Sequence, residues 1–261
     1  MTKEYIGLNP LKIEGSKFEV GYGYSKFVNL KINGKSYVPI LSSIINTFGV
    51  DWKDKLKEKV FCKIEEMDDY LSFYTKTTDF QSSLPFIYGA PTIKLGESIW
   101  GPSSGFDLGK VKDYKKMDTS IRWDFNVKKG YSDFSYDIWL TKDKKSKNSE
   151  KDDVEIMVIL SSNFPFPWKK VMETNKFVMQ YHNKNSKEWA STDRGHVIVF
   201  FLKNKTKNYG FDIKEMIKYC EKYLKASLKD YYIRSIDIIN EFSKNTEVEA
   251  KLFNLSFDFK K

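Results

Sequence analysis

Three acidic residues stand in apolar stretches of the sequence, where an ionised carboxylate is costly unless it is paired or used. They are Glu155 in residues 154–160, Asp137 in residues 134–140, and Glu241 at the end of residues 233–242. Carboxylates on apolar strands suit glycoside hydrolysis. One attacks the anomeric carbon, and a second, kept protonated by its surroundings, donates to the leaving oxygen. Structural ion pairs would place acids in the same way, so the pattern alone leaves both interpretations open.

Other catalytic chemistries find little support. The chain has two histidines, His182 and His196, and two cysteines, Cys62 and Cys220. It has no Gly-x-Ser-x-Gly elbow, phosphate-binding loop, His-Glu-x-x-His or Cys-x-x-Cys motif. Hydrolysis by a serine triad and zinc chemistry are therefore disfavoured, and no disulfide framework is expected.

The position of Glu155 in its strand decides which side chains would lie beside it. Because successive residues of a strand point to opposite faces, Glu155, Met157 and Ile159 share one face. Residues 154, 156, 158 and 160 share the other face, and both faces are apolar. The strand is therefore covered on both sides or lines a cleft.

The elements that would position these acids are short strands. Alternating runs cover residues 17–20, 27–32, 70–76, 121–128, 134–141, 154–160, 176–181, 196–202, 233–242 and 250–259. Turn sequences such as Asn33-Gly34 and Lys129-Gly130 bound several of them. Many short strands at this spacing predict a β-sandwich or a β-barrel.

Two stretches have helical patterns instead. Residues 213–226 carry an apolar stripe at helical spacing, and Asp212 can cap their first turn. A weaker helical pattern covers residues 40–48. The sequence has no internal repeat and no linker, so we expect one domain over residues 1–261.

The charge of the chain raises the question of its partners. The net charge is +9, from 44 basic and 35 acidic residues, and aromatic residues make up 16% of the chain. The lysines alternate with acids, as in residues 53–55 and 142–144, which indicates a solvated surface. No stretch approaches the roughly 18 apolar residues of a membrane span. We expect neither a nucleic-acid nor a membrane partner, although a basic nucleic-acid-binding β-protein remains a rival.

Residues 154–158 (Val-Glu-Ile-Met-Val) resemble the nucleophile strand of glycoside hydrolase family 12, which usually reads Glu-(Ile/Leu)-Met-(Val/Ile)-Trp. Residues 119–123 and 136–141 look like the two preceding strands, and the family's Asp that hydrogen-bonds the nucleophile falls on Asp137. Residues 84–89 are similar to the family's Tyr-Pro-Glu-Ile-x-Tyr-Gly segment. Residues 236–242 resemble the strand Glu-x-Gly-Thr-Glu-Phe, whose second Glu is the acid/base and falls on Glu241.

This resemblance runs in order from about residue 70 to residue 259 and implies both a fold and an activity. The fold would be an all-β jelly-roll sandwich of two stacked antiparallel sheets, with a concave cleft and one α-helix on the convex side. The activity would be that of a retaining, cellulase-type endo-β-1,4-glucanase that needs no metal or cofactor. Glu155 would be the nucleophile and Glu241 the acid/base, while Asp137 would orient Glu155 and keep its pKa low.

The sequence departs from the family pattern at three places. Ile159 stands where the family has a cleft-facing Trp, so one aromatic wall of the site is missing. Ile239 and Asn240 replace a Gly-Thr pair, and Phe86 replaces a Glu. These differences bear on substrate preference rather than on the reaction, because they leave the three carboxylates in place.

Substrate contacts are expected from five side chains: Tyr88, Trp100, Met157, Ile159 and Trp168. Trp100 is also a candidate for the Trp that follows the family's Pro-Glu segment. Trp100 and Trp168 lie in Gly/Pro-rich loops, so they are candidates for stacking on sugar rings. A jelly roll that binds carbohydrate without cleaving it would keep these aromatics and remains the alternative.

The expected substrate also bears on location and assembly. A polymeric glucan does not cross membranes, so secretion is expected, whereas a native start at Met1 would indicate a cytoplasmic protein. We expect the protein to act as a monomer on β-glucan.

Overall fold

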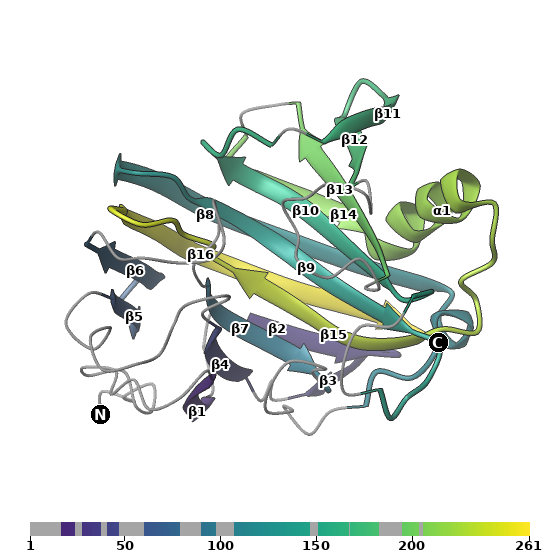
Figure 1. The fold of residues 1–261 in the computed structure, drawn as a ribbon. Helices are drawn as coiled ribbons and strands as arrows, with labels where there is room; N and C mark the ends of the chain where they lie inside the picture. The colour runs from purple at the N-terminus through teal and green to yellow at the C-terminus, as the bar shows by residue number, and fades with distance from the viewer. Residues whose placement is uncertain are drawn as a thin grey trace.

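Two stacked β-sheets form the described part of the protein in a computed structural model (Figure 1). The structure describes residues 17–23, 28–37, 41–46, 60–78, 90–97, 107–146, 151–166, 168–182, 195–203 and 206–261. The strands in the first half of the chain are β1 (Lys17–Gly23), β2 (Val28–Ile32), β3 (Lys35–Tyr37), β4 (Leu41–Asn46), β5 (Val60–Glu66), β6 (Leu71–Thr77), β7 (Ala90–Gly96) and β8 (Lys116–Lys129). Those in the second half are β9 (Asp133–Thr141), β10 (Val154–Ser162), β11 (Lys169–Glu173), β12 (Phe177–Tyr181), β13 (His196–Leu202), β14 (Asn208–Asp212), β15 (Tyr232–Ile239) and β16 (Glu247–Lys260).

The strands divide into a nine-stranded and a seven-stranded sheet. The larger sheet has the order β1-β4-β7-β15-β9-β10-β13-β12-β11. The smaller sheet has the order β14-β8-β16-β2-β3, and β6 pairs with β16 and with β5. This architecture confirms the predicted jelly-roll sandwich.

The prediction of purely antiparallel sheets is wrong in one respect. Among the described strands, each sheet contains one parallel pair, β10 with β13 and β16 with β2. Parallel neighbours need a long connection, and here the β11–β12 hairpin lies between β10 and β13 in the chain. Alternation along a strand identifies its faces but carries no information about the direction of its neighbour.

The predicted helical stretch at residues 40–48 is also wrong. Residues 41–46 form β4, which pairs with β1 on one side and with β7 on the other. A short apolar run fits either periodicity, and here pairing with two neighbouring strands overrides the weak helical pattern.

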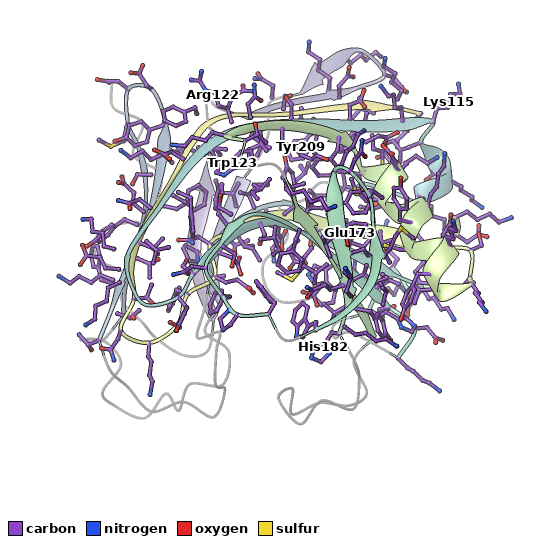
Figure 2. All side chains as sticks on the ribbon, turned by 90° about the horizontal axis from the view of Figure 1, so that it is seen from above. Lys115, Arg122, Trp123, Glu173, His182 and Tyr209 are labelled. Carbon is purple, nitrogen blue, oxygen red and sulfur yellow. The ribbon has the colours of Figure 1, made fainter. Side chains whose placement is uncertain are left out.

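The core lies between the two sheets. Figure 2 shows the two layers from above, with Trp123 on the inner side of the smaller sheet and Arg122 on its outer side. Every second residue of a strand points into the core, and both sheets contribute. The core side chains include Ile121 and Trp123 of β8, Tyr136 and Ile138 of β9, and Ile156 and Val158 of β10. Each fully buried side chain of this size contributes about 1.5–3 kcal/mol of hydrophobic stabilisation.

One helix, α1 (Ile213–Leu224), fills the end of the sandwich beside β14. The Asp212 carboxylate accepts a hydrogen bond from the backbone N–H of Lys214 and caps the first turn as predicted. The Tyr219 ring packs edge-on against Phe177 of β12, on the core side of the larger sheet. The helix ends two residues earlier than predicted, because Lys225 takes a left-handed conformation with φ 53°.

A tight turn fixes the start of β9, where part of the site lies. Gly130 has φ 74°, and a Cβ at this position would lie 2.4 Å from Thr246 Oγ1. Only glycine therefore fits this conformation and this close approach. The turn joins β8 of the smaller sheet to β9 of the larger one.

Candidate active site

The second face of the larger sheet, opposite the core, carries the predicted acids. Strand pairing sets Lys94 of β7 beside Asp237 of β15, Asp237 beside Asp137 of β9, and Asp137 beside Met157 of β10. Strand parity places Glu155 on the same face, because Ile156 and Val158 point into the core. The predicted alternation along β10 is therefore confirmed.

Glu155 and Asp137 are neighbours on adjacent strands. Glu155 is half-buried and lies opposite Trp139 of β9, two residues from Asp137. Asp137 is buried, and its Oδ2 accepts a hydrogen bond of 2.8 Å from Trp139 Nε1. Burial raises the pKa of Asp137 well above its usual range, and the charges of Glu155 and Asp237 raise it further. These surroundings favour the protonated form of Asp137.

Glu241 lies just beyond β15, which ends at Ile239 rather than at residue 242 as predicted. The chain here turns to hydrogen-bond with the start of β9. The Glu241 carbonyl accepts hydrogen bonds from the Asp133 N–H at 3.1 Å and from Ser132 Oγ at 2.5 Å. Asn240 Nδ2 donates to the Asp133 carbonyl at 2.7 Å. These bonds replace a regular ladder and hold Glu241 against β9.

The Glu241 side chain is buried beside the carboxyl group of Asp133. Burial raises the pKa of Glu241 well above its usual range, and the charge and hydrogen bond of Asp133 add to this effect. Burial also raises the pKa of Asp133 to about 7, although hydrogen bonds from Glu241 and Ser135 oppose the rise. This shift favours the protonated form of Glu241, which is the form that a general acid requires.

A buried ion pair completes the row of charges. Lys94 Nζ lies 3.1 Å from Asp237 Oδ2, and both side chains are almost fully enclosed. Burial raises the pKa of Asp237 to about 6, although the positive charge of Lys94 opposes it. Lys94 thus offsets one of the negative charges on this face.

An apolar patch lies beside the acids on the same face. It comprises the buried side chains of Ala90, Met157, Ile159, Val199 and Ile239. Phe166, Trp168 and Phe201 are partly buried and pack against it. The Phe166 ring contacts both of the others edge-on, with centroids 5.1 Å from Trp168 and 5.0 Å from Phe201. These aromatic side chains cover Ile159, which is 3% exposed.

The structure thus brings most of the predicted site residues together. Glu155, Asp137 and Glu241 share one face with Met157 and Ile159, and Trp168 packs against the adjoining apolar patch. Tyr88 and Trp100 lie outside the described residues.

Comparison with known families identifies the protein class. The family model for glycosyl hydrolase family 12 matches residues 88–259, which is more than half of the chain. The chain belongs to glycosyl hydrolase family 12. It is therefore a glycoside hydrolase, and the carboxylates on the second face of its larger sheet form the candidate active site.

Solved structures of family 12 enzymes share this fold. A family 12 xyloglucanase from Bacillus licheniformis, in complex with ligand, superposes with a TM-score of 0.68 at 18% identity, covering 94% of this chain and 98% of that one. An endoglucanase from Rhodothermus marinus gives 0.60 at 16% identity, covering 83% and 92%. The catalytic domain of a Humicola grisea enzyme, soaked with thio cellotetraose, gives 0.61 at 13% identity, covering 84% and 92%. No curated protein sequence matches the chain.

Three residues of this family 12 site were missed by the sequence analysis. Asp133 and Asp237 each lie four residues before an acid that was recognised, Asp137 and Glu241. An even spacing puts both members of such a pair on one face of a strand, so strand parity could have found them. Lys94 stands alone in residues 90–95 and gave no comparable signal.

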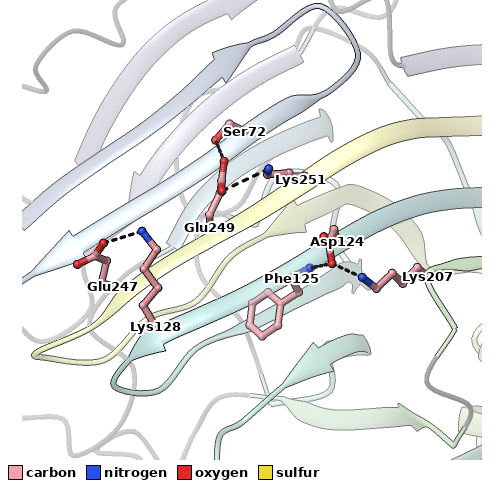
Figure 3. A network of polar contacts seen from close by, with 8 residues as sticks. All are labelled: Ser72, Asp124, Phe125, Lys128, Lys207, Glu247, Glu249 and Lys251. Carbon is pink, nitrogen blue, oxygen red and sulfur yellow. Dashed lines mark hydrogen bonds and ion pairs between the residues drawn. The ribbon is translucent and has the colours of Figure 1, made fainter.

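The outer face of the smaller sheet provides a contrast. Its acids pair with lysines at the surface, as Glu247 does with Lys128 and Asp124 with Lys207 (Figure 3). These contacts support the prediction that the lysines form a solvated surface. In the described part of the chain, no helix is long and apolar enough to span a membrane, and no group of His, Cys, Asp and Glu side chains could hold a metal ion.

Proposed function

We propose that this family 12 glycoside hydrolase is a retaining endo-β-1,4-glucanase with Glu155 as nucleophile and Glu241 as acid/base. One observation carries the proposal. Glu155 lies on β10 and Glu241 follows β15, and these two strands flank β9, which carries the buried Asp137. Their surroundings differ as a double displacement requires, because Glu155 is half-buried whereas Glu241 is buried and has a raised pKa.

In the first step, the Glu155 carboxylate attacks the anomeric carbon. The bond from that carbon to the glycosidic oxygen breaks, and Glu241 gives its proton to the departing oxygen. In the second step, Glu241 removes a proton from water, and the water oxygen displaces Glu155 from the sugar. Two inversions at one carbon retain its configuration.

Asp137 would assist Glu155 through a hydrogen bond rather than through its charge. Its raised pKa favours the protonated form, and its Oδ1 finds no hydrogen-bond partner among the described residues. A neutral Asp137 can donate to the Glu155 carboxylate, which favours the ionised form of Glu155. In this way an acid with a raised pKa would keep its neighbour ionised and in position.

The β-1,4-glucan backbone is the proposed substrate. The neighbouring structures include a xyloglucanase and an enzyme soaked with thio cellotetraose, and a β-1,4-linked glucan chain is common to both ligand classes. The apolar patch beside the acids, with Phe166, Trp168 and Phe201 against it, offers ring surfaces to pyranose rings.

The proposal is tested by Glu155→Gln. The amide is nearly isosteric but cannot attack, so release of reducing sugar from soluble β-glucan should fall by at least a thousandfold while the protein still folds and binds glucan. Glu249→Gln makes the same change on the other sheet, where Glu249 accepts a hydrogen bond from Ser72, and should retain activity. Azide should restore turnover to Glu155→Ala and yield the inverted glycosyl azide.

Two outcomes would contradict the proposal. Unchanged activity in Glu155→Gln would remove Glu155 from the reaction. Glucan binding without any reducing-sugar release by the wild-type protein would identify a carbohydrate-binding jelly roll instead.

A further inference from the structure

We infer that Asp133 is a positioning residue for Glu241, because the two carboxyl groups share a single proton that Glu241 delivers to the leaving group. This inference rests on the proposed role of Glu241 as acid/base. Asp133 does not reach the reacting atoms in this scheme and acts only through Glu241.

The backbone holds the two side chains against each other. The Asp133 N–H donates to the Glu241 carbonyl at 3.1 Å, and Asn240 Nδ2 bridges the Asp133 carbonyl and Ser132 Oγ at 2.7 and 2.8 Å. A second bridge pairs Ser132 with Phe242. The segments on either side of the carboxyl pair are therefore tied together, which leaves little freedom to separate the pair.

The oxygen atoms of the pair point to a shared proton. Asp133 Oδ2 and Glu241 Oε2 are both buried, and neither has a donor among the described protein groups. The two side chains are nevertheless hydrogen-bonded to each other. Two carboxylates offer only acceptors, so this hydrogen bond requires that one of them carries the proton.

The surroundings assign that proton to Glu241. Ser135 Oγ donates to Asp133 Oδ1 at 3.1 Å, and a donor stabilises the ionised form of its partner. Glu241 Oε2 has no such donor. The favoured arrangement is therefore a neutral Glu241 that donates to an ionised Asp133.

Other charged groups face this pair from the neighbouring strands. They are Asp137 on β9, Glu155 on β10, Asp237 on β15 and Lys94 on β7. Burial raises the pKa of Asp133, and Lys94 is engaged with Asp237. The mostly acidic surroundings favour retention of the shared proton.

The shared proton serves both steps of the reaction. When Glu241 gives its proton to the departing oxygen, two carboxylates are left side by side and repel each other. The repulsion makes Glu241 a stronger base for the second step, in which it takes a proton from water. That proton restores the original pair, so the cycle is balanced without any other donor.

The decisive variant is Asp133→Asn, which removes the negative charge and offers an amide donor to Glu241. Glu241 should then lose its proton at lower pH, and the alkaline limb of kcat/KM on β-glucan should move down by at least about one pH unit, which is tenfold in activity on that limb. A dinitrophenyl β-cellotrioside needs no proton on its leaving group, so formation of the glycosyl-enzyme from it should be nearly unaffected. Asp124→Asn, at an exposed site on the other sheet, should leave the pH profile unchanged.

Titration of the free protein provides a second measurement that does not depend on turnover. The infrared carboxyl band of wild-type protein should include a group that ionises well above pH 5, and Asp133→Asn should shift it to lower pH. Glu241→Gln should likewise lower the pH at which Asp133 ionises, because the Gln amide would donate a hydrogen bond to the Asp133 carboxylate.

Two results would overturn the inference. One is an alkaline limb in Asp133→Asn that coincides with that of the wild type. The other is an equal loss of activity on glucan and on the activated substrate, which would indicate structural damage alone. A wild-type protein that cleaves neither substrate would instead refute the proposed function, while the infrared titration would still decide whether the proton is shared.

Discussion

The enclosed Lys94 on the second face of the larger sheet forms an ion pair with Asp237. Lys94→Met would leave Asp237 buried without its 3.1 Å ion pair. Breaking a buried pair in this way costs about 3–5 kcal/mol, so we expect a loss of this size in the free energy of unfolding near neutral pH. The loss should be smaller at pH 5, because Asp237, whose pKa burial raises to about 6, can then be protonated. Urea denaturation at the two pH values measures both effects.

An exposed lysine provides the control for this change. Lys112 pairs with Asp230 at 2.8 Å, but both side chains are more than half exposed. Lys112→Met should therefore lower the free energy of unfolding far less than Lys94→Met does. Equal losses in the two variants would mean that the Lys94 pair is not enclosed in solution.

At the scale of single residues, the sequence identified acids by their apolar neighbours. Glu155, Asp137 and Glu241 were recognisable because each interrupts an apolar run, and strand parity applied more widely would have added Asp133 and Asp237. Lys94 could not have been linked to Asp237 in this way. The two residues are 143 positions apart, and only the pairing of β7 with β15 brings them together.

At the scale of elements, local signals were reliable and long-range ones were not. The hairpin turn at Asn33-Gly34, with φ of 52° and 76°, and the capped helix α1 follow from short-range chemistry and were predicted. The strand β4 and the two parallel pairs depend on partners distant in the sequence. The same limit applies to the apolar patch that contains Ile159 of β10. Its aromatic neighbours come from β13 and from the segment before β11.

The segment before β11 carries the aromatic side chain that the sequence suggested as a sugar platform. Trp168 is partly buried, and its ring meets Phe166 and His182 edge-on, with centroids 5.1 Å away in both cases. If one of its faces stacks on a pyranose ring, Trp168→Ala loses roughly 0.5–1.5 kcal/mol of binding. KM for cello-oligosaccharides should then rise by up to about tenfold, with little change in kcat.

Phe253→Ala is the control, because Phe253 lies on the smaller sheet against Arg122 and Tyr70. It should leave KM unchanged. A lower melting temperature with an unchanged KM in Trp168→Ala would show that the indole only packs against Phe166 and His182.

At the scale of the whole molecule, acidic groups occupy two different environments. At the surface, carboxylates pair with lysines, and Glu173 between Lys170 and Lys203 has its pKa lowered to about 2. On the second face of the larger sheet, burial raises the pKa of Asp133, Asp137, Asp237 and Glu241. The net charge of +9 therefore gives no indication of the buried acids on the second face of the larger sheet.

This division determines how stability depends on pH. A carboxyl group whose pKa is higher in the folded than in the unfolded state binds more protons when folded. Its contribution is complete below the unfolded pKa of about 4 and is lost as the pH rises through the folded pKa. For Asp237 and Asp133 the loss extends to about pH 6 and about pH 7, and Asp137 and Glu241 add to it because burial raises their pKa values well above the usual range.

The urea midpoint at constant ionic strength should therefore fall as the pH is raised from about 5 to about 7, through the raised pKa values of Asp237 and Asp133. The buried His182 opposes this trend. Burial lowers its pKa, so it stabilises the fold increasingly as the pH rises to the unfolded histidine pKa of about 6.5. That contribution is the same in Asp133→Asn as in the wild type, so the difference between the two proteins reports the carboxyl groups alone. The surface ion pairs do not interfere, since the lowered pKa of Glu173 matters only in acid. Asp133→Asn should flatten the decline, because it removes one of the four groups and lets Glu241 ionise with a donor beside it. A decline of the same size in both proteins between about pH 5 and about pH 7 would contradict the raised pKa values of the Asp133 and Glu241 pair, and with them the acid role of Glu241.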